Sequence, residues 1–133
     1  LGGFDPAFFM YGEEADLCAR ARKLGARPLF TPYAEIVHHG GASEPVRALK
    51  MQKLLAAKAL LVRRHWHPAT QPLGLALLAL WPLSRALALR LADALRGRCE
   101  HDAASACWRE IWRGRRNWLA AYGTAAEAAA TIR

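Results

Sequence analysis

The 133-residue sequence is poor in cysteine and lacks the paired cysteine spacings that mark disulfide-rich secreted domains and structural zinc sites. Its three cysteines, Cys18, Cys99 and Cys107, are an odd number without a CxxC pair. These features argue against a disulfide framework and a cysteine-based zinc site. We interpret the cysteines as free thiols in a reducing compartment.

Acidic residues are almost missing from the middle of the chain. Residues 46–99 hold ten lysines and arginines against Asp93 alone, a net charge of +9, whereas residues 1–45 hold four basic and six acidic residues, a net charge of −2. The remaining residues, 100–133, add +1, which completes the formal charge of +8. This asymmetry predicts an acidic part that carries chemistry, followed by a basic part that meets phosphates, nucleic acid or anionic lipid.

An apolar run long enough to cross a membrane alone is also missing. Residues 72–83 are almost wholly apolar, but a spanning helix takes about 20 apolar residues. Arg85 and Arg90 follow on the next turns. This pattern is more typical of a helix that lies in the membrane interface with its arginines at headgroup level.

The spacing of apolar residues predicts a helix from about Gly12 or Glu13 to Gly25, which stands where a helix C-terminal cap belongs. Short strands are expected at 27–31 and 35–39. The first part, residues 1–45, therefore has the character of an α/β domain. Residues 46–133 are expected to be mainly helical, with helices at about 46–67, in the apolar segment and at 107–122, and a linker at 97–105.

Three carboxylates stand at the start of the first predicted helix. On a helical wheel Glu14 falls within the apolar arc of that helix, Glu13 at its border, and Asp16 on the polar side, four residues before Arg20. Acids are also favoured in a first helical turn by the helix dipole, and Asp16 with Arg20 is an ordinary ion pair. The pattern alone leaves open a catalytic and a structural interpretation.

A longer pattern surrounds these acids. Residues 1–43 resemble the C-terminal half of the catalytic domain of family 2 glycosyltransferases, and most closely the rhamnosyltransferase-like branch. The matching elements are Gly2-Gly3-Phe4-Asp5, Phe8-Phe9-Met10-Tyr11, Glu13-Glu14, Asp16-Leu17, Arg20, Gly25, Pro32, His38 and Gly40-Gly41-Ala42-Ser43.

The resemblance implies a GT-A fold of the α/β class, a nucleotide-sugar donor and inversion at the anomeric carbon. It implies transfer of a sugar such as rhamnose to a saccharide or polyprenyl-linked acceptor in cell-surface polysaccharide synthesis. In this family one carboxylate of the acid pair removes the acceptor proton, which makes Glu14 the expected base. Glu13 and Asp16 would position the acceptor or orient Glu14. The usual family pair is Glu-Asp, and the Glu-Glu here extends the reach of the base by one methylene.

The resemblance also implies a divalent metal, Mg²⁺ or Mn²⁺, on the donor diphosphate, with His38 as one ligand. Gly2, Gly3 and Asp5 correspond to the loop that lines the acceptor side, with Arg20 among the substrate-binding residues, and Ser43 would flank the diphosphate. The family's Asp-x-Asp and donor-binding segments are missing from these 133 residues, and the chain begins at Leu1. We therefore expect a C-terminal fragment that is inactive alone.

The basic, tryptophan-rich remainder, residues 46–122, carries no catalytic motif. Its arginines and tryptophans favour docking at a membrane surface, with the enzyme peripheral on the cytoplasmic, inner face of the cell membrane. A helical subdomain packed on the catalytic part is compatible with this. The alternative function is a non-catalytic basic module that binds a membrane surface or nucleic acid. Nucleic acid is disfavoured because the tryptophans stand beside long leucine runs.

Overall fold

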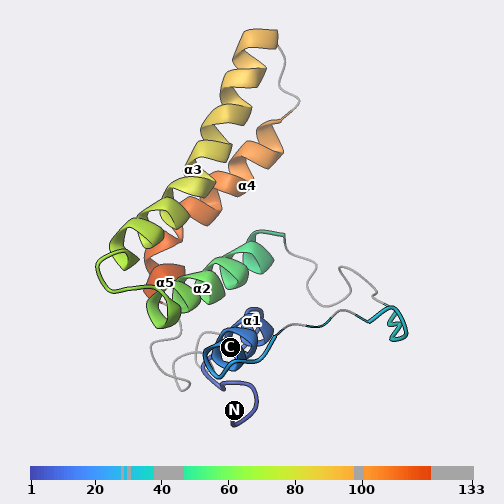
Figure 1. Cartoon of the computed structure of the whole chain (residues 1–133). Helices are drawn as coiled ribbons and strands as arrows, with labels where there is room; N and C mark the ends of the chain where they lie inside the picture. The colour runs from blue at the N-terminus through green and yellow to red at the C-terminus, as the bar shows by residue number, and fades with distance from the viewer. Residues whose placement is uncertain (28, 30, 38–46, 98–100, 121–133) are drawn as a thin grey trace.

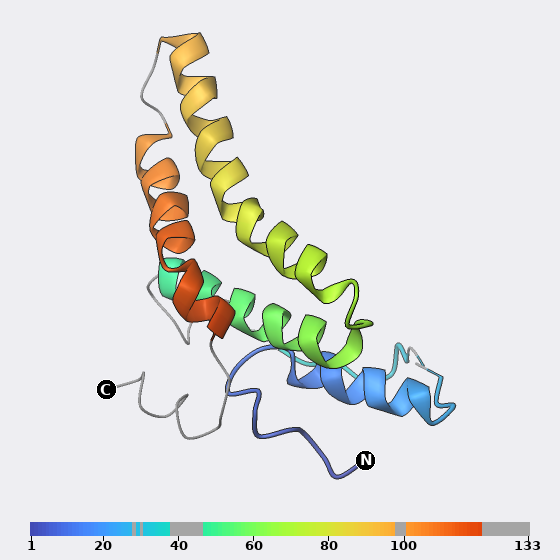
Figure 2. The ribbon, with the colours of Figure 1, turned by 90° about the vertical axis from the view of Figure 1, so that its left-hand side faces the viewer.

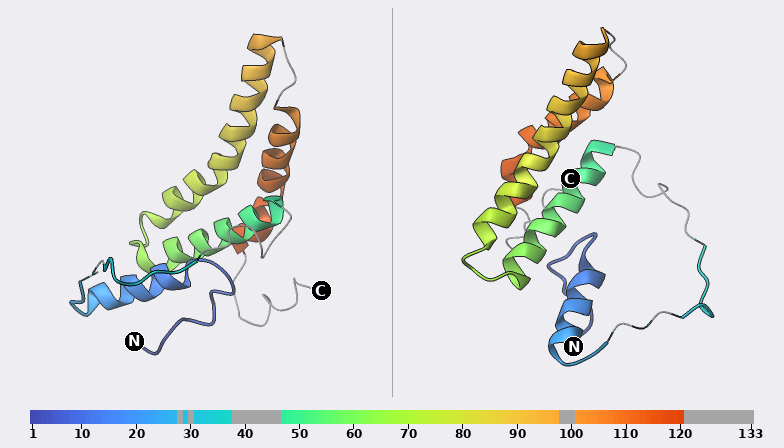
Figure 3. Two further views of the ribbon diagram at one scale, coloured as in Figure 1. Left: turned by 90° about the vertical axis from the view of Figure 1, so that its right-hand side faces the viewer. Right: turned by 45° about the horizontal axis from the view of Figure 1, so that its top comes forward.

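The computed structural model describes residues 1–27, 29, 31–37, 47–97 and 101–120. The described residues form five α-helices: α1 (Glu13–Lys23), α2 (Arg47–His65), α3 (Gln71–Arg96), α4 (Asp102–Arg113) and α5 (Arg115–Ala120). The long α3 and the shorter α4 run side by side as an antiparallel arm, and α2 crosses the base of this arm (Figure 1). Helix α1 lies on the side of α2 that faces away from α3 (Figures 2 and 3).

The prediction of an α/β GT-A fold is wrong for the structure, because the described residues contain no strand. The described residues of the two expected strands, at 27–31 and 35–39, are irregular. A strand needs a neighbouring strand for its backbone groups and a covering layer for its apolar face. Here Leu29 is 95% exposed and Ile36 is 88% exposed, so no layer covers these two described residues of the segments.

The helical predictions are largely confirmed. Helix α1 ends one residue before Leu24, and Gly25 follows with a φ of 86°, the left-handed conformation expected of a C-terminal cap. The Gly25 N–H donates to the Arg22 carbonyl at 3.0 Å, and the Ala26 N–H donates to that of Ala21 at 3.1 Å. Helix α2 ends before Pro68, as predicted. The linker predicted at 97–105 is wrong from Asp102 onward, where α4 begins.

The main core lies where α2, α4 and α5 meet. Leu55 of α2 and Ile111 of α4 are almost inaccessible to solvent, and Trp118 of α5 donates its indole N–H to the Ile111 carbonyl at 2.8 Å. Burying one such side chain stabilises the fold by about 1.5–3 kcal/mol. The apolar residues of α3 that pack against this core include Leu78 and Trp81. Helices α2 to α5 are therefore held together by apolar contacts.

A second, smaller cluster attaches the N-terminal segment to the opposite face of α2. Phe8 is buried against Ala57 and Leu60. The chain then turns at Gly12, whose φ of 84° suits glycine, and a Cβ there would lie 3.3 Å from the Ala57 side chain. This close approach places the first turn of α1, with its three carboxylates, beside α2.

Helix α3 is distinct in composition. By length and apolar content it is the one helix in the described part of the chain that could cross a membrane, and only 17% of its most apolar stretch is buried within the protein. The sequence prediction of an apolar helix after Pro68 is confirmed. The expectation that its apolar segment is too short to span a membrane is wrong by length and composition, because the helix continues past residue 83 to Arg96.

Candidate functional site

Asp16 is the centre of the polar cluster on α1. It is only 1% exposed, and its two carboxylate oxygens accept hydrogen bonds from Arg20 Nε and His65 Nε2, each at 2.8 Å. Burial raises the pKa of Asp16, but the hydrogen bonds from Arg20 and His65 and their positive charges outweigh burial and hold the pKa below its usual 3.8. Asp16 is therefore an ionised, fixed acceptor that joins α1 to the end of α2.

The bond to Asp16 fixes the role of the His65 ring. Because an ionised carboxylate only accepts, Nε2 is the protonated nitrogen that donates to it. The other ring nitrogen, Nδ1, is buried and has no hydrogen-bond partner among the described residues. This arrangement holds the imidazole in one orientation against α1.

Arg20 connects Asp16 to the first residues of the chain. Its guanidinium donates to the Gly3 carbonyl at 2.7 Å and also to the Leu1 carbonyl. Gly2 and Gly3 have φ values of 72° and 79°, a conformation that suits glycine and lets the segment turn toward the guanidinium. The structure thus brings together Gly2, Gly3, Asp16 and Arg20, which the sequence placed in one site.

Asp5 is tied to the same end of α2 by a second ion pair. One oxygen accepts the Ala7 N–H at 2.8 Å, and the other pairs with Arg64. The Arg64 guanidinium also lies 5.6 Å from the centre of the Phe8 ring. Two adjacent residues of α2, Arg64 and His65, therefore hold two carboxylates of the N-terminal segment.

The acid pair itself lies at the edge of this frame. Glu14 is exposed and makes no hydrogen bond or ion pair within the described chain, whereas Glu13 is half-buried and its Oε2 is buried without a described partner. The prediction that Glu14 lies on the inward face of the helix is wrong, since Asp16 occupies that face and Leu24 is 76% exposed. His65 at the basic end of α2 bonds to Asp16 and so draws that side of α1 inward. This bond, and not the apolar residues of α1, accounts for the side that faces α2.

The backbone just before the acid pair is unusual. Tyr11 has a φ of 69°, and it is the one residue other than glycine with a positive φ in the described chain. A bulky residue in this region is strained, and such strain is often found next to functional sites. Tyr11 and Gly12 together set the direction in which α1 begins, so that its first helical turn lies beside α2.

Two predicted site residues, His38 and Ser43, lie outside the described residues. Within the described ranges no three histidine, cysteine or carboxylate side chains gather in a way that could hold a metal ion. The described part of the chain therefore does not supply a site for the predicted Mg²⁺ or Mn²⁺, and the metal stays a prediction that concerns His38.

Sequence reasoning missed Arg64 and His65 as parts of this cluster. The run of basic residues at 63–65 gives a signal in hindsight, because it stands at the end of a helix in a chain whose acids gather near the N-terminus. The pairing of the two regions depends on tertiary packing, which the spacing of residues alone does not reveal.

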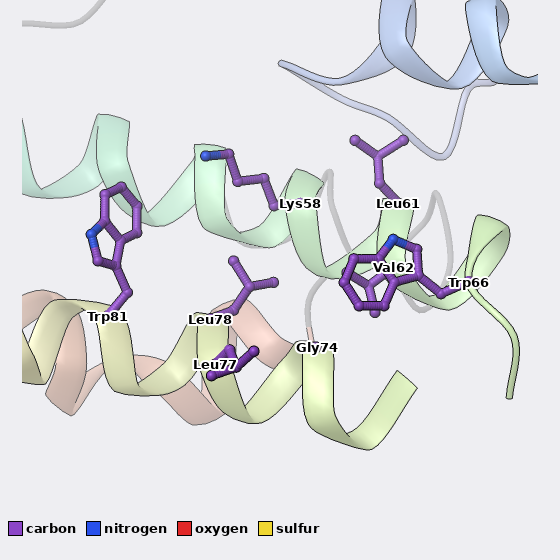
Figure 4. A pocket seen from close by; sticks show the side chains of 8 residues that line it. All are labelled: Lys58, Leu61, Val62, Trp66, Gly74, Leu77, Leu78 and Trp81. Carbon is purple, nitrogen blue, oxygen red and sulfur yellow. The ribbon is translucent and has the colours of Figure 1, made fainter. Parts of the chain in front are cut away.

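A separate apolar groove of about 590 Å³ lies between α2 and α3 (Figure 4). Trp66 and Trp81 stand at its two ends, and Lys58 from α2 places its ammonium group 5.2 Å from the centre of the Trp81 ring. Gly74 allows the close approach of the helices, since a Cβ there would lie 2.9 Å from the Trp66 ring. Leu61, which lines the groove, also packs against the cluster around Phe8.

Two curated proteins from two strains of Mycobacterium tuberculosis are 46% identical to this chain over 39 residues. Both are named N-acetylglucosaminyl-diphospho-decaprenol L-rhamnosyltransferase. The match covers 29% of this chain, and the chain spans only 13% of the length of these relatives. No family model matches the chain, and no solved structure matches it. The similarity suggests a glycosyltransferase relationship, in agreement with the sequence prediction at that level.

Proposed function

We propose that this chain carries the base and part of the acceptor side of an inverting glycosyltransferase of the rhamnosyltransferase-like branch. The observation that carries the proposal is the 46% identity over 39 residues to the mycobacterial rhamnosyltransferases. The clustering of Gly3, Asp16 and Arg20 in one hydrogen-bonded frame supports it, because the family motif contains these residues.

In the proposed reaction, the Glu14 carboxylate takes the proton from an acceptor hydroxyl while the hydroxyl oxygen attacks the anomeric carbon of the donor. A new carbon–oxygen bond forms, the bond to the nucleoside diphosphate breaks, and the diphosphate leaves with the electron pair. The configuration at the anomeric carbon inverts. Glu14 suits this role because it is exposed, is not committed to another described group, and stands in the first turn of α1, where the helix dipole favours negative charge.

The neighbouring residues act as a frame for Glu14 and the acceptor. Asp16 is held by Arg20 and His65, so it orients α1 and does not take the proton itself. Glu13 contacts or positions the acceptor together with Gly2, Gly3 and Asp5. In this proposal most residues that bind the donor lie outside these 133 residues. Within them, His38 would be one ligand of a divalent metal and Ser43 would flank the diphosphate.

The acceptor in this proposal is a saccharide carried on a polyprenyl diphosphate, by analogy with the acceptor in the printed name of the mycobacterial relatives. Transfer then takes place at the cytoplasmic, inner face of the cell membrane, as a step of cell-surface polysaccharide synthesis. The donor is a nucleotide sugar such as a nucleoside-diphosphate rhamnose.

The test compares Glu14→Gln with Glu35→Gln in cells that express the complete gene carrying this chain. Both positions are exposed, so neither change disturbs packing. Membranes are supplied with a radiolabelled nucleoside-diphosphate rhamnose and N-acetylglucosaminyl-diphospho-polyprenol, and label in the lipid is counted. We expect Glu14→Gln to lower the rate by about 10²–10⁴-fold, the usual contribution of a general base, and Glu35→Gln to leave it unchanged. Equal rates for Glu14→Gln and wild type would exclude Glu14 as the base.

A second measurement concerns the donor side. We expect the purified 133-residue chain to transfer no sugar from the same donor, because the proposal places the donor-binding residues elsewhere. Transfer by the purified chain would show that these residues suffice and would contradict that part of the proposal.

A further inference from the structure

Helix α3 carries a stripe of leucines, interrupted at Ser84, on the face opposite α4. The members are between 53% and 79% exposed: Leu73, Leu77, Leu80, Leu87, Leu91 and Leu95. They are three or four residues apart except between Leu80 and Leu87, where the exposed Ser84 takes the intervening position. They share one side of the helix, over a length of about 33 Å at 1.5 Å per residue. Leucines that stay more than half exposed along one helix face form a large apolar patch, and such patches mark contact with a partner or a membrane.

The charges around this leucine stripe have one sign. Arg85 and Arg90 are exposed and lie about 100–120° to either side of the stripe on a helical wheel. The one acid of α3, Asp93, is buried on the opposite face and accepts two hydrogen bonds from His101, at 2.7 Å and 3.0 Å. The exposed face of α3 therefore presents leucines and Ser84 in the middle, arginine at both borders and no carboxylate.

We propose that the leucine stripe of α3 docks on the surface of an anionic phospholipid bilayer, with the helix axis in the plane of the membrane. The leucines enter the boundary between headgroups and acyl chains, and Arg85 and Arg90 extend to the phosphates. Trp66, which is about half exposed at the corner between α2 and α3, lies beside the first turn of the stripe, where an indole favours the interface.

The packing of α3 against α4 favours this orientation over a membrane span. Ser105 of α4 donates to the Ala86 carbonyl in a buried contact of 3.3 Å, and Asp93 is bonded to His101, so α4 is attached along α3. A spanning α3 would carry the exposed Arg109 and Glu110 of α4 into the hydrocarbon, which is costly for charged groups. In the plane of the membrane, α4 stays on the aqueous side.

The flanking arginines also favour lipid over a second copy of this chain. The spacing of the leucines resembles the apolar seam of a coiled coil, but pairing two stripes would bring arginines of two chains with a net charge of +8 each close together. An anionic membrane neutralises the same arginines. The proposal does not depend on the proposed sugar transfer, because it concerns α3 and not the carboxylates of α1.

The test uses the full 133-residue chain and flotation with vesicles of equal parts phosphatidylglycerol and phosphatidylcholine. Leu80→Gln/Leu87→Gln removes two leucines from the stripe, and the matched control Leu24→Gln/Leu29→Gln removes two leucines that are at least as exposed elsewhere. Since all four side chains are exposed, both variants keep the fold. We expect binding to weaken by at least tenfold in the stripe variant, as two leucines leave the interface, and to be unchanged in the control.

A charge variant, Arg85→Gln/Arg90→Gln, is expected to weaken binding to these vesicles by about fivefold per arginine and to have little effect with pure phosphatidylcholine.

Three results would overturn the proposal. They are unchanged binding in the stripe variant, a wild-type dimer without vesicles that the stripe variant dissociates, and a wild-type chain that resists alkaline extraction from the membrane. The second result would show that the stripe contacts another copy of the chain, and the third would show that α3 spans the bilayer.

Discussion

The two faces of α2 are covered by different kinds of contact. On one face, α3 to α5 pack through apolar side chains around Leu55, Ile111 and Trp118. On the other, the N-terminal segment is held by Phe8 and by two carboxylates that bond to Arg64 and His65 at the last turn of α2. One helix thus supports an apolar bundle and an electrostatically attached segment.

This difference teaches which part of the molecule responds to conditions. The stability that comes from apolar burial depends little on pH and salt. Ion pairs with partly exposed partners are weakened by salt, which screens the charges, and by acid, which protonates the carboxylates. The carboxylates proposed for chemistry belong to the segment that is attached by charge. The placement of Glu13 and Glu14 therefore depends on Asp16 and His65, and we expect the bundle to stay folded when the segment is released.

The largest expected effect is in the bundle. Leu55→Ala removes a side chain with 0% exposure and leaves a cavity, which costs about 2–5 kcal/mol of folding free energy. Leu49→Ala, on the same helix but 46% exposed, is the control and should cost much less. Urea unfolding followed by circular dichroism measures both. Similar losses for the two variants would contradict the position of the core.

A second prediction separates the segment from the bundle. Asp16→Asn keeps the shape of the side chain but removes the charge that Arg20 and His65 share, so α1 should open more readily from α2. We expect hydrogen exchange of the α1 amides to increase at least tenfold, with the amides of α2 to α5 unchanged. Glu14→Gln, two residues away and exposed, is the control and should leave α1 protected. Faster exchange throughout the chain in Asp16→Asn would show that the two parts are not separable.

These positions also show what the sequence could and could not predict. Helical spacing and the caps at Gly25 and before Pro68 are local signals, and the helices they predict are present. The Asp16–Arg20 pair was also predictable, because residues four apart share one side of a helix. The side of α1 that faces inward was not predictable, because it depends on the basic end of α2. His65, which bonds to Asp16 there, lies 49 positions further along the chain.

The predicted strands failed for a related reason. The segments at 27–31 and 35–39 have apolar residues and flanking turn residues, but pairing and cover must come from elsewhere in the fold. The described residues around these segments provide no partner strand and no covering layer, and Leu29 and Ile36 are accordingly exposed. A local pattern can therefore name a candidate strand without establishing a sheet.

A third prediction uses pH to compare the two attachments. The folded-state pKa of Asp16 lies below 3.8 for the reasons given above, and that of Asp93 is lowered by its hydrogen bond from His101, against the opposing effect of burial. Each carboxylate therefore contributes stability that is complete above its unfolded pKa of about 4 and is lost as the pH falls through the lower folded value. Acidification from pH 6 to pH 2 should release α1 and loosen the α3–α4 junction.

Hydrogen exchange at several pH values, corrected for the intrinsic rate, measures this release. The difference between wild type and Asp16→Asn in α1 should be large at pH 6 and should shrink toward zero at the acid end, because the wild-type carboxylate is then protonated. A difference that stays constant down to pH 2 would mean that the charge of Asp16 does not hold the segment.

The smallest expected effect concerns the turn that leads into α1. Gly12 and Gly25 have nearly equal φ values, 84° and 86°, but a Cβ at Gly12 would lie 3.3 Å from the Ala57 side chain, whereas at Gly25 it would meet nothing within 4 Å. Alanine at either position has the same backbone strain, which costs about 1 kcal/mol of folding free energy. Gly12→Ala should therefore be the more harmful, and the difference between the two variants in α1 hydrogen exchange isolates the contact with α2. Equal effects would show that Phe8 and the ion pairs hold the segment without close packing at this turn.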